Sequence, residues 1–152
     1  MSKPAMKPDQ VISTLNSLTE TCRDGQKGFQ EAAEHIENPQ IKEFCLEQSR
    51  TRAQFFGELQ QQVRSLGGDP EKTGSVAAAI HRGWIDLKSA FGGGDHAILA
   101  ACETGEDAAV KEYKKALDET LPAPVRDVVE RQWRSIKQTH DKVKGLRDRL
   151  DK

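Results

Sequence analysis

Apolar residues recur at three- and four-residue steps along most of the chain, which is the spacing of one face of an α-helix. The pattern is interrupted at Asn38-Pro39, at Gly67-Gly68-Asp69-Pro70 and at Leu121-Pro122-Ala123-Pro124, and prolines and paired glycines end helices. Four long segments therefore predict an all-α fold. The predicted helices span about residues 9–38, 40–66, 95–119 and 125–150.

The lengths of the connections predict how these helices are arranged. The first and second helices, and the third and fourth, are joined by only a few residues, so each pair is expected to be antiparallel. Residues 67–94 separate the two pairs and contain a shorter helical pattern at about 75–91. At ~1.5 Å per residue that helix would reach roughly 26 Å, enough for the third helix to start beside the start of the second. We predict a ferritin-like up-down-down-up four-helix bundle with a short extra helix in the long crossover.

Length, charge and cysteine content narrow the class of protein. The 152 residues are expected to form one domain over 9–151 after a disordered segment at 1–8. Since 23 basic residues nearly balance 24 acidic ones, we expect neither a nucleic-acid nor a membrane partner. The chain shows no signal-peptide pattern and no apolar run of membrane-spanning length. Three cysteines without a CxxC spacing predict a reducing compartment, the cytoplasm, and buried apolar roles for Cys22, Cys45 and Cys102.

Several polar residues fall on the apolar helix faces when successive residues are placed about 100° apart around the helix axis. In the predicted topology Gln26, Arg52, Glu106 and His140 come from four separate helices and lie at nearly the same height, where ferritin-like bundles place two metal ions. We expect them to form a buried polar network. Its members are Gln26, Gln48, Arg52, Glu106 and His140.

The chemistry of this layer does not suit two metal ions. A di-iron or di-manganese site needs a Glu from each of two helices and Glu-x-x-His from each of the other two, and Glu-x-x-His does not occur in this chain. Glu106 points inward and Glu103 lies at the edge of the same face, while Arg52 adds a fixed positive charge. We therefore expect no metal or other cofactor, and we expect Arg52 to pair with Glu106, assisted by His140 and Gln26. The glutamates expected to point outward include Glu20, Glu31, Glu47 and Glu130.

Two alternatives to this network follow from the same residues. In the first, iron or manganese binds with Glu103, Glu106 and His140 as candidate ligands. In the second, a small ligand occupies an apolar gap in the bundle near Gly25 and Gly105. Trp84, in the crossover, is expected to pack against the bundle rather than to form a contact surface.

Four segments of the chain are distinctive when taken in order: ETCRDGQKGFQEAAEHIE, LGGDPEKTGSVAAAIHRGW, CETGEDAAVKEYKKAL and HDKVKGLRD. They resemble segments of small bacterial ferritin-like four-helix-bundle proteins, a family related to rubrerythrin and grouped as a domain of unknown function. The resemblance covers roughly residues 9–149. It implies a bacterial cytoplasmic protein of a group with suspected stress-related roles.

The resemblance also shows where this chain departs from metal-binding relatives. Glu103-x-x-Glu106 is similar to the paired glutamates on the third helix of rubrerythrin-like proteins. At the Glu-x-x-His positions of the second and fourth helices this chain has Glu47-x-x-Arg50 and Glu130-x-x-Trp133. The expected function is therefore that of a non-enzymatic structural or interaction protein that self-associates. The alternative function is that of a metal-binding redox or iron-handling protein.

Overall fold

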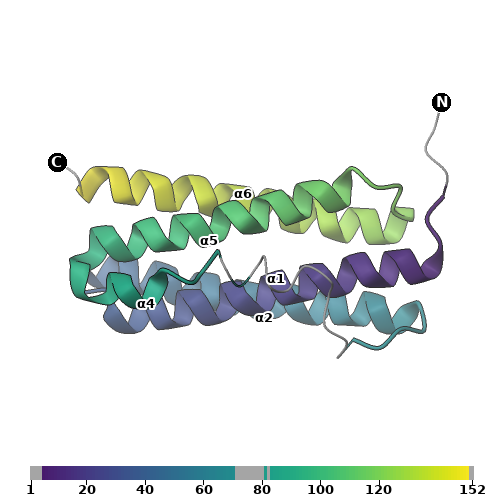
Figure 1. Cartoon of the computed structure of the whole chain (residues 1–152), viewed down its shortest axis with the longest axis horizontal. Helices are drawn as coiled ribbons and strands as arrows, with labels where there is room; N and C mark the ends of the chain where they lie inside the picture. Colours follow the sequence, from purple (N-terminus) through teal and green to yellow (C-terminus); the bar gives the residue numbers. More distant parts are fainter. Residues whose placement is uncertain (1–4, 71–80, 82, 151–152) are drawn as a thin grey trace.

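The computed structural model describes residues 5–70, 81 and 83–150. These residues form helices and turns, with no strand among them, so the predicted all-α four-helix fold is confirmed (Figure 1). A short helix and one 3₁₀ turn precede the third long helix. The elements are α1 Pro8–His35, α2 Pro39–Ser65, α4 Leu87–Ala90, η1 Phe91–Gly93, α5 Gly94–Leu117 and α6 Ala123–Leu150.

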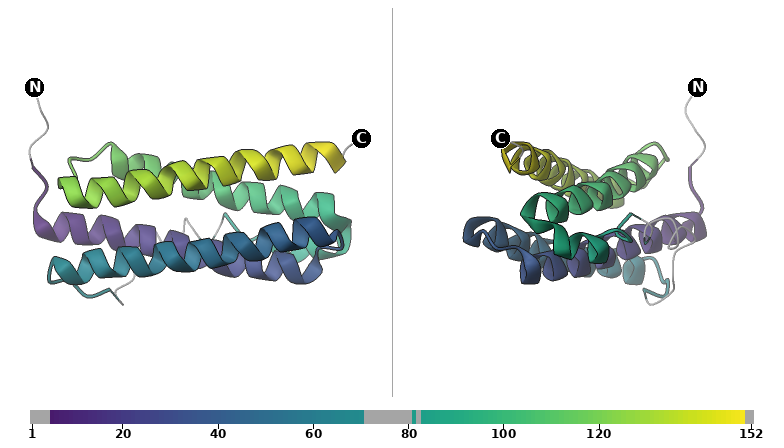
Figure 2. Two further views of the ribbon diagram at one scale, coloured as in Figure 1. Left: turned by 180° about the vertical axis from the view of Figure 1, so that it is seen from behind. Right: turned by 60° about the vertical axis from the view of Figure 1, so that its left-hand side comes forward.

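The four long helices pack as two pairs, α1 with α2 and α5 with α6. In Figure 1, α1 and α6 run in one direction and α2 and α5 in the other, and the views in Figure 2 show the α5–α6 pair lying over the α1–α2 pair. The Asp95 carboxylate accepts hydrogen bonds from the main-chain N–H groups of Glu37 and Asn38 at 2.8 and 2.9 Å. Thr14 donates to Glu119 at 3.3 Å near the opposite end. These contacts hold α1 and α5 antiparallel along their length.

The tight connection between α1 and α2 has a local cause. The side-chain oxygen of Asn38 accepts hydrogen bonds from the N–H groups of Gln40 and Ile41 at 2.9 and 3.1 Å, which caps α2, and Pro39 occupies its first helical position. At the other end of α2, Gly67 has φ +80°, a left-handed conformation that favours glycine after a helix. Both ends of α2 are therefore set by residues that the sequence pattern identifies as helix ends.

The structure differs from the predicted elements in the crossover. Residues 71–80 and 82, which include most of the expected 75–91 helix, lie outside the described residues. Within the described part, residues 83–86 form turns and are followed by the four-residue helix α4 and by η1, so no single helix continues to Phe91.

Both ends of the chain also differ from expectation. Met6 packs against the apolar core and Pro8 is the first residue of α1, so the expected disorder over 1–8 does not hold for these two residues. At the other end, the apolar spacing of the fourth predicted helix continues to Leu150, but this side chain is 41% exposed. None of the helices in the described part of the chain combines the length and apolar character needed to cross a bilayer.

The apolar core is divided into two clusters, one in each half of the bundle. Each cluster draws residues from all four long helices, and a short polar zone separates the clusters at the middle. The first cluster includes Leu15, Leu18, Cys22, Phe55, Leu59, Ala109, Tyr113, Val129 and Ile136. The second includes Phe29, Ala33, Phe44, Cys45, Ile98, Leu99, Cys102 and Val143.

Candidate functional site

A buried ion pair joins α2 to α5 between the two apolar clusters. Arg52 Nη2 donates a hydrogen bond to Glu106 Oε2, and the two side chains are 1% and 0% exposed. The guanidinium also lies over the Phe29 ring, 5.6 Å from its centroid. Burial acts to lower the pKa of Arg52, but the charge and the hydrogen bond of Glu106 outweigh it and raise that pKa above its ordinary value. Glu106 therefore faces a permanent cation supplied by a side chain.

Gly25 on α1 provides the space for this cation. A Cβ atom at Gly25 would lie 2.6 Å from Arg52 Nη1, closer than side chains tolerate. Glycine within a helix costs about 1 kcal/mol relative to alanine. The contact with Arg52 explains why α1 carries a glycine at this position.

Each side chain of the ion pair has one buried polar atom that forms no hydrogen bond. Arg52 Nη1 and Glu106 Oε1 are buried and have no hydrogen-bond partner. An unsatisfied buried polar atom is costly, so the pair is held mainly by its one charge-assisted hydrogen bond and by the surrounding packing. Neither His140 nor Gln26, the expected partners, forms a hydrogen bond with this pair.

The other members of the expected network lie elsewhere. The Gln26 side chain is half-buried, and its main-chain carbonyl accepts a hydrogen bond from Ser49 Oγ at 2.9 Å. Gln48 Oε1 accepts a hydrogen bond from Thr139 at 2.8 Å, which links α2 to α6. Of the expected network of five residues, only Arg52 and Glu106 are therefore joined to each other.

His140 lies at the edge of the α5–α6 interface. Its Nε2 atom is 2.5 Å from Asp107 Oδ1 and its Nδ1 atom is 3.1 Å from Asp141 Oδ1. The buried face of α6 passes through Thr139 and Val143. Because His140 is turned about 100° beyond Thr139, it leaves the centre of that face and cannot replace Thr139 in the interior.

A second set of polar contacts crosses the bundle near the ion pair. Tyr113 OH donates to Gln132 Oε1 at 2.7 Å, and Gln132 Nε2 donates to Glu58 Oε1 at 3.1 Å. The Glu58 carboxylate in turn lies 2.5 Å from Arg131 at the surface. Cys22 Sγ is 3.0 Å from Tyr113 OH, and because the phenol proton is given to Gln132, the Cys22 thiol is the donor. Gln132 lies on the same buried face of α6 as Val129 and Ile136, but spacing along one helix cannot show that it pairs with Tyr113 on another.

The buried thiols are expected to be chemically inert in the folded protein. Burial raises the pKa of Cys22 to about 11 and that of Cys45 to about 12, and burial raises the pKa of Cys102 well above its ordinary value. At pH 8 we expect no reaction of the native chain with a thiol-specific disulfide reagent, and reaction of three thiols per chain after unfolding in guanidinium. Rapid modification of a thiol in the native chain would contradict this burial.

Of the candidate metal ligands named from the sequence, Glu103 and His140 come together, whereas Glu106 lies apart from them. In the described part of the chain, the group of His, Cys, Asp and Glu side chains that comes together is Glu103, Asp107 and His140, with ligand atoms within 4.8 Å of one another. Glu106 faces Arg52 instead. Glu20, expected to point outward, is buried, but it pairs with Arg23 at 3.4 Å. The residues around Glu106 therefore do not fit a pair of buried metal ions.

The sequence argument missed Asp107, a member of this group, and Arg147, which lies beside it. Asp107 lies four residues after Glu103, so both project from one face of α5. Arg147, seven residues after His140, projects from the same side of α6 and forms an ion pair with Glu103. Both spacings can be seen in the sequence, but only residues expected to point into the bundle were considered for the site, so Asp107 and Arg147 were left out.

The contacts of His140 predict a pH-dependent contribution to stability. Partial burial lowers its pKa, but the hydrogen bonds with Asp141 and Asp107 raise it more, to above the ordinary value of 6.5. A raised pKa means that protonated His140 stabilises the fold below pH 6.5 and that this stabilisation is lost as the pH rises through the folded-state pKa. In buffer with a chelator, His140→Gln should lower the free energy of unfolding more at pH 5.5 than at pH 9. A difference that does not change with pH would contradict this assignment.

The gap proposed near Gly25 and Gly105 is filled by side chains of the chain itself. A Cβ atom at Gly105 would lie 2.2 Å from the Trp84 indole, and one at Gly28 would lie 2.3 Å from it. The indole also packs edge-on against Phe29, with ring centroids 5.3 Å apart. Trp84 thus occupies a notch between α1 and α5, as the packing prediction for this residue requires, and the alternative of a ligand there is not supported.

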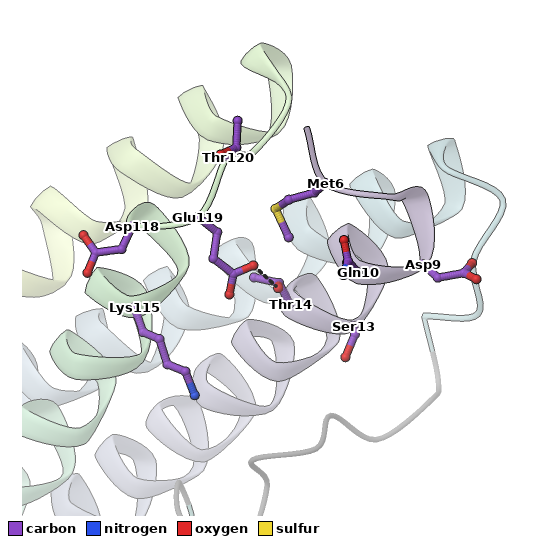
Figure 3. A pocket seen from close by; sticks show the side chains of 9 residues that line it. All are labelled: Met6, Asp9, Gln10, Ser13, Thr14, Lys115, Asp118, Glu119 and Thr120. Atoms are coloured by element: carbon purple, nitrogen blue, oxygen red, sulfur yellow. Dashed lines mark hydrogen bonds between the residues drawn. The ribbon is translucent and has the colours of Figure 1, made fainter. Parts of the chain in front are cut away.

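An open pocket of about 630 Å³ lies where α1 begins and α5 ends (Figure 3). Thr14 and Glu119 form a hydrogen bond within it, whereas the carboxylates of Asp9 and Asp118 point outward on opposite sides. Met6 is its main apolar side chain. The polar groups do not converge on a common point, so the pocket offers no arrangement for catalysis.

Comparison with protein families places most of the chain within a family model. The model of the family described as Domain of unknown function (DUF2383) matches residues 10–119, which extend from α1 through the end of α5. No curated protein matches the chain in sequence.

Proposed function

This chain belongs to the DUF2383 family, whose description assigns no activity, and we propose that it is a non-enzymatic ferritin-like bundle that acts as a structural or interaction protein. The directions of the four long helices support the ferritin-like assignment, since α1 and α6 run opposite to α2 and α5 (Figure 1). In this proposal the protein works in the bacterial cytoplasm, associates with copies of itself and takes part in a stress response.

The observation that carries the proposal is the ion pair of Arg52 with Glu106. In a dimetal bundle, carboxylates and histidines converge on the ions from all four helices. Here the one fully buried carboxylate on α5 is bound by a guanidinium, which cannot lose its charge at physiological pH. The charge that metal ions would supply at Glu106 is thus already present, which supports a role without oxygen or peroxide chemistry.

Metal analysis tests this proposal against a di-iron or di-manganese alternative. The chain is expressed with iron and manganese supplied and purified without a metal-affinity column or chelators. We expect no iron or manganese whose amount depends on Glu106, so the wild type and Glu106→Gln should carry the same quantity. We also expect no iron-dependent oxygen consumption. Two ions per wild-type chain that are lost in a folded Glu106→Gln variant would overturn the proposal.

A further inference from the structure

Three side chains with metal-binding atoms meet on the outer edge of the α5–α6 interface, away from the buried ion pair. Glu103 and Asp107 are one turn apart on α5, and His140 reaches them from α6. One ligand atom from each lies within 4.8 Å of the others. A single ion placed among them could contact all three after small side-chain rotations.

The imidazole of His140 is oriented by a residue outside this group. Asp141 Oδ1 lies 3.1 Å from Nδ1, so Nε2 is directed toward Asp107. Metal-binding histidines in proteins usually make such a contact through the second ring nitrogen, which fixes the ring and makes the other nitrogen a stronger ligand. The His140 side chain is 16% exposed and that of Asp107 is 53% exposed, so an ion and its water ligands can enter from solvent.

The charges around Glu103 and Asp107 allow a metal ion to replace the side-chain cations that contact them. Glu103 and Asp107 repel each other at their i, i+4 spacing unless a cation lies between them. In this structure Arg147 contacts Glu103 and His140 contacts Asp107. Arg147 also forms an ion pair with Asp148 at 2.9 Å, so it keeps a partner if an ion takes its place at Glu103.

We propose that Glu103, Asp107 and His140 form a site for one divalent transition-metal ion of the zinc class, which links α5 to α6. One imidazole nitrogen and two carboxylate oxygens suit Zn²⁺, Mn²⁺ or Fe²⁺ better than Ca²⁺ or Mg²⁺, which prefer oxygen ligands alone. Three protein ligands leave a coordination position for water. The site is independent of the proposed function, because Glu106 takes no part in it.

Zinc titration of the full-length chain, after treatment with a chelator, tests this site. Calorimetry with Zn²⁺ and absorption spectroscopy with Co²⁺ should both give one ion per chain, and Zn²⁺ should raise the melting temperature. His140→Ala and Asp107→Asn should each weaken binding by at least about tenfold. Arg147→Gln should strengthen it, because the cation that competes for Glu103 is removed.

The matched control is His35→Gln, which removes a surface imidazole that contacts a main-chain carbonyl and stacks on Phe91. This variant should bind Zn²⁺ like the wild type. The inference is overturned if no saturable 1:1 binding occurs, or if folded His140→Ala and Asp107→Asn retain wild-type affinity. It is also overturned if binding is lost in His35→Gln.

Discussion

Arg52→Met is expected to lower the free energy of unfolding by about 3–5 kcal/mol, because it leaves the Glu106 carboxylate buried without a counter-charge. Both side chains lie almost wholly out of contact with solvent, so water cannot replace the guanidinium. Urea unfolding followed by circular dichroism measures the loss. A similar loss of stability is expected for any substitution that removes one charge of the ion pair and keeps the other.

The double variant Arg52→Met/Glu106→Leu separates the ion pair from simple packing. Removing both charges leaves apolar side chains between two apolar clusters, so most of the lost stability should return. Arg50→Met is the control, since Arg50 forms an exposed pair with Glu43 and should change stability by less than about 0.5 kcal/mol. A double variant less stable than Arg52→Met would show that the ion pair is not the source of the cost.

Gly105→Ala is expected to destabilise the fold, although alanine is the better helix former. The new methyl group would meet the Trp84 indole at 2.2 Å, and such overpacking costs about 1–3 kcal/mol, more than the roughly 1 kcal/mol gained in helix propensity. Gly145→Ala on α6 meets no atom within 4 Å and should stabilise the fold by up to about 1 kcal/mol. In thermal unfolding, Gly105→Ala should lower the melting temperature and Gly145→Ala should raise it, although the chemical change is the same.

A Trp84→Ala background tests the cause of this difference. Once the indole is removed, Gly105→Ala should become stabilising, as is expected of Gly145→Ala in the wild type. If Gly105→Ala stabilises the wild-type chain as well, the indole does not occupy the notch between α1 and α5.

The helices and the ion pair could be predicted because one physical rule governs them. Arg52 and Glu106 lie at the centre of long apolar helix faces. An error of about 20–30° in their assumed position around the helix axis still leaves these side chains pointing into the bundle. Asn38, Pro39 and Gly67 could be identified as helix ends because their backbone chemistry acts locally.

The edges of those faces could not be predicted in the same way. His140 is four residues from Ile136 and three from Val143, so it lies at the edge of the buried face of α6. Whether its side chain points inward depends on where α5 crosses α6, and helical spacing gives no information about that crossing. The notch for Trp84 needs two glycines, at 28 and 105, that lie on different helices and become neighbours only after the helices pack. Periodicity therefore identifies the centre of the bundle, whereas tertiary contacts decide the partners at its margins.

The most direct test of the central claim is an anomalous-difference map from crystals grown in excess Mn²⁺. We predict guanidinium density of Arg52 against the Glu106 carboxylate and no anomalous peak within coordination distance of that carboxylate. An anomalous peak bound to Glu106, with Arg52 turned away from it, would contradict the account.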